Sequence, residues 1–126
     1  MPIDYAVFTL SLVRNKMIME INLLYFDGCP SWQIALANLQ TALKEERLDI
    51  PINLIEVKSD QDAAAVKFLG SPSFQIDGKD FWSDDLQIYS MNCRVYGTLE
   101  GLKGWPTVDM FRQKLLSMIK VKEQLK

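Results

Sequence analysis

Hydrophobic and polar positions along the first half of the chain alternate between two periods, which predict strands and helices in turn. Residues 18–26 are mostly aliphatic or aromatic and predict a mainly buried strand. Residues 30–47 carry apolar side chains at helical spacing and predict a helix that buries one face. Residues 52–57 predict a second strand, and a second helix follows from Ser59, which caps it, to Gly70, which ends it.

The second half of the chain predicts a hairpin and a C-terminal helix. Phe74 and Ile76 alternate with polar residues before Asp77-Gly78, a hairpin turn signal. Residues 79–92 follow no clear period, and residues 93–96 predict the fourth strand. The apolar side of the last helix consists of Val108, Phe111, Leu115, Met118 and Ile119.

The order β-α-β-α-β-β-α predicts an α/β fold with a mixed sheet and helices on both faces. The helix between the first two strands makes them parallel, with a right-handed crossover. The last two strands form an antiparallel pair. We expect residues 20–126 to form a single domain, preceded by an N-terminal extension or extra strand over residues 1–19.

Composition and charge reduce the number of functions that this chain is expected to have. The chain has 126 residues, a net charge of -2 and no histidine, which excludes catalytic centres and metal sites that need an imidazole. Without a basic surplus we expect no nucleic-acid partner, and without a long apolar run we expect no membrane partner. Two cysteines do not make a disulfide framework in a chain of this size, so we expect a reducing, cytoplasmic setting.

Candidate chemistry centres on Cys29, in the stretch YFDGCPSW. Pro30 suits the first helical position, so Cys29 should lie at a helix N-terminus. Unpaired N–H groups and the helix dipole favour a thiolate there, although Asp27 opposes the effect. Cys29 is therefore either a reactive thiol, which we expect to be open to solvent, or a quiet turn residue.

Three stretches, GCPSW, FLGSPSFQIDG and NCRVY, together with the order of elements, resemble the thioredoxin-like superfamily and, more narrowly, a group of small bacterial thioredoxin-like proteins. The resemblance implies a thioredoxin-like fold in which Cys29 is the nucleophile. It also implies that Pro72 follows a cis peptide bond and faces Cys29. Ser71 would then present its backbone to an extended substrate.

Trp32 stands where a C-x-x-C motif would place the second cysteine. A dithiol mechanism at this motif is therefore excluded, and monothiol exchange remains, with glutathione or a thiol-containing protein as partner. We expect no cofactor other than glutathione as a co-substrate. Trp32 is either a substrate-binding aromatic residue or part of the packed face of the first helix.

Cys93 is the internal candidate for a resolving thiol. Placed at the start of a fourth strand, it would lie toward the end of the sheet away from Cys29, which favours a buried structural role. The neighbouring Arg94 is either a surface residue or a ligand for an anion. An aromatic and acidic cluster either lines a groove near Pro72 or packs as a loop; its members are Trp82, Asp84, Asp85, Tyr89 and Trp105.

Three functions therefore remain open. The first is monothiol thiol–disulfide exchange through Cys29. The second is a non-catalytic binding module on the same scaffold, for a protein or a small ligand. The third is binding of a soft metal ion by Cys29 and Cys93, for which two distant cysteines without histidine are a poor ligand set.

Overall fold

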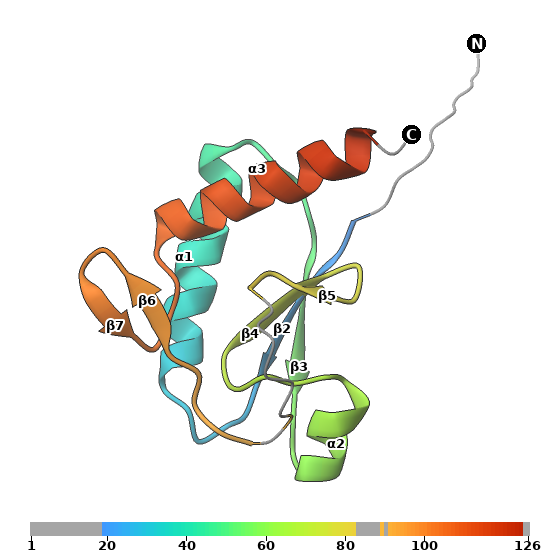
Figure 1. The fold of residues 1–126 in the computed structure, drawn as a ribbon, viewed down its shortest axis with the longest axis vertical. Helices are drawn as coiled ribbons and strands as arrows, with labels where there is room; N and C mark the ends of the chain where they lie inside the picture. Colours follow the sequence, from blue (N-terminus) through green and yellow to red (C-terminus); the bar gives the residue numbers. More distant parts are fainter. Residues whose placement is uncertain (1–18, 83–88, 90, 125–126) are drawn as a thin grey trace.

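The computed structural model describes residues 19–82, 89 and 91–124, which form an α/β domain (Figure 1). The predicted extension over residues 1–19 lies outside the described residues except for its last residue. The elements, in chain order, are β2 (Ile21–Tyr25), α1 (Ser31–Glu45), β3 (Ile52–Glu56), α2 (Asp60–Ala65), β4 (Ser73–Ile76), β5 (Lys79–Asp80), β6 (Tyr96–Thr98), β7 (Gly101–Lys103) and α3 (Val108–Gln124).

The main sheet is mixed and has four strands in the order β3-β2-β4-β5. The pair β2 and β3 is parallel, as the connecting helix α1 requires, whereas β4 runs antiparallel to β2. The predicted turn at Asp77-Gly78 is confirmed, since both residues have positive φ angles, 52° and 83°, and join β4 to β5. A separate two-stranded hairpin, β6–β7, precedes α3.

Helices cover both faces of the main sheet, as predicted. Adjacent residues of a strand point to opposite faces, and the neighbours Leu23 and Leu24 belong to different buried clusters. Leu23 packs with residues of α1 and α3, among them Leu39 and Phe111. Leu24 packs with Ala63 of α2. Figure 1 shows α3 crossing α1, with α2 apart from both.

Two predicted boundaries are wrong. The fourth strand is β5, not residues 93–96, because the tight turn returns the chain to β4 at once, pairing Lys79 with Ile76. The second helix ends at Ala65 rather than near Gly70, because Lys67 adopts a left-handed conformation with a φ of 58°. None of the described helices is both long and apolar enough to cross a membrane.

Candidate functional site

Cys29 lies in the loop between β2 and α1, next to Pro30, which precedes the first helical residue. Its backbone N–H donates to the carbonyl of Phe26 at 3.1 Å, which closes the turn. Only 1% of Cys29 is exposed. Its thiol donates to the carbonyl oxygen of Ser71, with Sγ and O 3.5 Å apart. The expectation of a solvent-open sulfur is therefore wrong, because the residue is covered by the segments around it.

Ser71 is the hydrogen-bonding centre of the site, and the peptide bond between Ser71 and Pro72 is cis, as the resemblance implied. The Ser71 side-chain oxygen accepts from the N–H of Phe26 at 3.3 Å. Its N–H donates to the carbonyl of Asn92 at 2.8 Å, and its carbonyl accepts from the N–H of Arg94 at 2.9 Å. The backbone that we expected to receive an extended substrate is therefore already paired with the chain's own residues 92–94.

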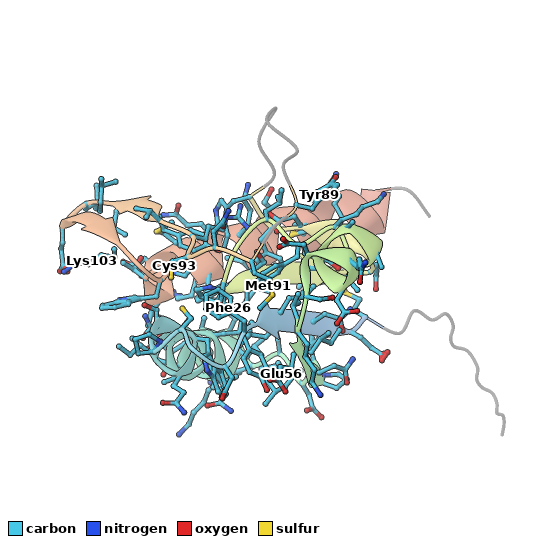
Figure 2. All side chains as sticks on the ribbon, turned by 90° about the horizontal axis from the view of Figure 1, so that it is seen from below. Phe26, Glu56, Tyr89, Met91, Cys93 and Lys103 are labelled. Atoms are coloured by element: carbon cyan, nitrogen blue, oxygen red, sulfur yellow. The ribbon has the colours of Figure 1, made fainter. Side chains whose placement is uncertain are left out.

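Cys93 lies directly beside this centre. It forms a parallel β-bridge with Ser71, whose carbonyl accepts from the Cys29 thiol, so both cysteines adjoin the same residue. Figure 2 shows Cys93, Met91 and Phe26 at the same end of the sheet. The prediction that Cys93 lies away from Cys29 and is buried is wrong, because residues 92–94 pair with Ser71 instead of extending the sheet, and Cys93 is exposed.

Burial of the protein-facing side of Cys93, together with the nearby charge of Cys29 and the hydrogen bond to it, raises the pKa of the Cys93 thiol. Both cysteines are free thiols in this structure. The site thus holds one thiol that solvent reaches and one that it does not, in contact with each other.

Arg94 anchors the segment that carries Cys93. Its guanidinium pairs with the carboxylate of Asp80 through two contacts, of 2.9 and 3.1 Å, and also donates to the Ser73 hydroxyl and the Trp82 carbonyl. The two side chains are only 10% and 7% exposed. Arg94 is therefore neither of the two things we expected, a surface residue or a free anion ligand.

Tyr96 provides a second anchor. Its hydroxyl donates to the carbonyl of Pro72 at 2.6 Å, and its ring lies under the Arg94 guanidinium, 5.0 Å from the Cζ atom to the ring centroid. Burial raises the pKa of Tyr96, partly offset by Arg94, so the hydroxyl remains a donor. The carbonyl of Pro72 is thereby held by the same segment that pairs with Ser71.

The aromatic residues predicted near the site have mainly packing roles. Trp32 is half-buried and stacks on Tyr25, with ring centroids 4.2 Å apart. Trp82 and Trp105 pack against the cluster under α1 and α3, whereas Tyr89 packs against the cluster under α2. They therefore do not line one groove, and Asp84 and Asp85 lie outside the described residues.

Sequence reasoning missed Asp80 and Tyr96 as parts of the site. The signal was present in NCRVY, because alternation along an extended segment directs Arg94 and Tyr96 inward while Cys93 and Val95 face outward. Within the described residues, no group of three or more acidic or cysteine side chains gathers as metal ligands would.

Comparison with known proteins adds no assignment: no protein-family model, no curated protein and no solved structure matches this chain. The functional argument therefore starts from the geometry of the two thiols and Ser71.

Proposed function

We propose that this chain is a thioredoxin-like thiol–disulfide exchange protein that acts through Cys29. The observation that carries the proposal is the position of the Cys29 thiol, at the start of α1 and on the Ser71 carbonyl, with a second cysteine, Cys93, bridged to the same residue. The order β2-α1-β3-α2-β4-β5-α3, with the β6–β7 hairpin inserted before α3, supports the thioredoxin-like assignment.

The burial of Cys29 limits how this exchange proceeds. A thiolate must reach the sulfur that it attacks, and an external disulfide does not reach a residue that is 1% exposed. Exchange by Cys29 alone, the monothiol mechanism, therefore requires that the segments packed around Cys29 move away first. The partner is a low-molecular-weight disulfide such as oxidised glutathione, or a disulfide of another protein, in a reducing, cytoplasmic setting.

The proposal is tested by treating the reduced, native protein with glutathione disulfide and locating oxidised cysteines by differential alkylation and mass spectrometry. We expect Cys29 to enter a disulfide and to return to the thiol when glutathione is added. The control is Cys29→Ser under the same conditions, which should show no disulfide at this position and so identifies the wild-type signal as that of Cys29. A native protein whose Cys29 remains a free thiol at equilibrium would exclude this function.

A binding module without redox chemistry is the second candidate. It is favoured by two apolar side chains on the β6–β7 hairpin, Leu99 and Leu102, which are 107% and 78% exposed. Figure 2 shows the hairpin, on which Lys103 is labelled, projecting away from the main sheet. A partner that binds in the presence of reductant and to Cys29→Ala, but not to Leu99→Ser/Leu102→Ser, would support this alternative over thiol exchange.

A further inference from the structure

We infer that Cys93 and Cys29 form a two-cysteine exchange centre across Ser71, in which exposed Cys93 attacks the external disulfide and buried Cys29 then resolves the product. This inference rests on the proposed function and specifies its mechanism. In this mechanism, a thiol from a distant segment of the chain takes the place of the second cysteine of a C-x-x-C motif.

The placement of the two residues carries the inference. Ser71 contacts both cysteines: its carbonyl accepts from the Cys29 thiol, and Cys93 is its partner in the β-bridge. Neighbouring strands lie about 4.8 Å apart, so this bridge brings the Cys93 backbone within reach of the Cys29 loop. Cys29 lies near enough to raise the pKa of the Cys93 thiol, and a disulfide requires that the two sulfur atoms approach to about 2.05 Å.

The order of reaction follows from access. Cys93 is exposed, whereas Cys29 is covered, so an incoming disulfide meets Cys93 first. Ser71 has its N–H and carbonyl already paired with residues 92–94, which leaves no free backbone there for an extended peptide. The substrate class that fits is therefore a small disulfide, or a protein disulfide exposed enough to approach Cys93 without docking along Ser71.

The chemical steps balance as follows. The Cys93 thiol loses its proton to solvent, and its sulfur attacks one sulfur of the external disulfide, which forms a mixed disulfide and releases the first external thiolate. The Cys29 thiol then loses its proton and attacks the sulfur of Cys93, which forms the Cys29–Cys93 bond and releases the second thiolate. The two thiolates take up the two protons, so the external disulfide is reduced and the protein dithiol is oxidised.

The test uses glutathione disulfide as the probe and compares wild type with Cys29→Ser and Cys93→Ser. Wild type should release two glutathione molecules per chain and yield a cross-linked Cys29–Cys93 peptide without a lasting adduct. Cys29→Ser, whose hydroxyl can still donate to the Ser71 carbonyl, should accumulate a glutathione adduct on Cys93. In Cys93→Ser, modification of Cys29 should be at least about tenfold slower than in wild type.

Two results would overturn the two-cysteine order: modification of Cys29 in Cys93→Ser at the wild-type rate, or separate glutathione adducts on both cysteines of wild type without the cross-linked peptide. The wild-type stoichiometry involves no substitution, so it decides the question even where a variant folds poorly. If Cys29 of wild type never becomes oxidised, the proposed function itself fails. If Cys29 is oxidised equally fast without Cys93, exchange stands and only this inference fails.

Discussion

Arg94→Met should release the segment that pairs with Ser71 beside Cys29 and destabilise the domain. In the folded protein the guanidinium makes paired contacts with Asp80, at 2.9 and 3.1 Å, in a site where both side chains are nearly buried. Methionine fills similar volume but leaves the Asp80 carboxylate without its cation. Because the Arg94 N–H donates to the same Ser71 carbonyl that accepts from the Cys29 thiol, the loss should affect both stability and thiol access.

The magnitude follows from the burial of the pair. Removing one partner of a buried ion pair costs about 3–5 kcal/mol, because the remaining charge is uncompensated. That is a large part of the roughly 5–15 kcal/mol by which a typical domain is stable. With a urea m-value of about 2 kcal/mol/M, the unfolding midpoint should fall by about 2 M. The double variant Arg94→Met/Asp80→Asn has no uncompensated carboxylate at position 80. Its free energy of unfolding should therefore fall by less than the sum of the two single losses.

Urea unfolding followed by tryptophan fluorescence measures these losses, and the rate at which iodoacetamide labels Cys29 measures access. The matched control is Arg112→Met, since Arg112 also pairs with a carboxylate, that of Glu46, but is 41% exposed. Its midpoint should move far less, and Cys29 labelling should not change. An Arg94→Met midpoint equal to that of the control, or single losses that simply add in the double variant, would refute the reasoning.

Two further predictions concern the same segment. Gly70 has a φ of 119°, and a Cβ there would lie 2.7 Å from Oδ1 of Asn92. Gly70→Ala should therefore lower the free energy of unfolding, measured with denaturant, more than Gly78→Ala, where φ is also positive but no atom lies within 4 Å. Equal losses would contradict the close approach. Because the pKa of Cys93 is raised, its rate of alkylation should increase at higher pH than that of a free cysteine. Cys29→Ala should move this pH profile back to lower pH, because it removes the interactions with Cys29 that raise the pKa. Superimposable pH profiles of wild type and Cys29→Ala would contradict this cause of the shift.

Local sequence signals were sufficient to predict much of the fold. Ser59 was predicted to cap the second helix, and its hydroxyl does accept from the N–H of Asp62 at 3.0 Å. Phe111 and Leu115 were predicted to face the core from the last helix, and both are fully buried. These features depend on residues within a few positions of each other, which is why periodicity and capping patterns find them.

The arrangement of the site depended on pairing between distant segments, which periodicity does not report. The stretch NCRVY has the alternation of a strand and was assigned to the sheet, but Cys93 forms an isolated bridge with Ser71, and Tyr96 pairs with Lys103 in the separate hairpin. The competing assignment, β5, has only two residues and is specified by the Asp77-Gly78 turn rather than by its own composition. Because Cys93 was assigned to a strand of the main sheet, the prediction that it lies far from Cys29 was wrong as well.

The pairing at Ser71 also explains why burial of Cys29 and exposure of Cys93 belong together. The same two backbone hydrogen bonds that use the Ser71 N–H and carbonyl hold residues 92–94 beside the carbonyl that accepts from the Cys29 thiol. An extended segment that turns Arg94 inward toward Asp80 must turn Cys93 to the other side, where solvent reaches it. One register thus turns Arg94 toward its ion-pair partner and presents Cys93 to solvent. The proposed exchange through Cys93 therefore depends on the register of residues 92–94 as well as on the two sulfur atoms.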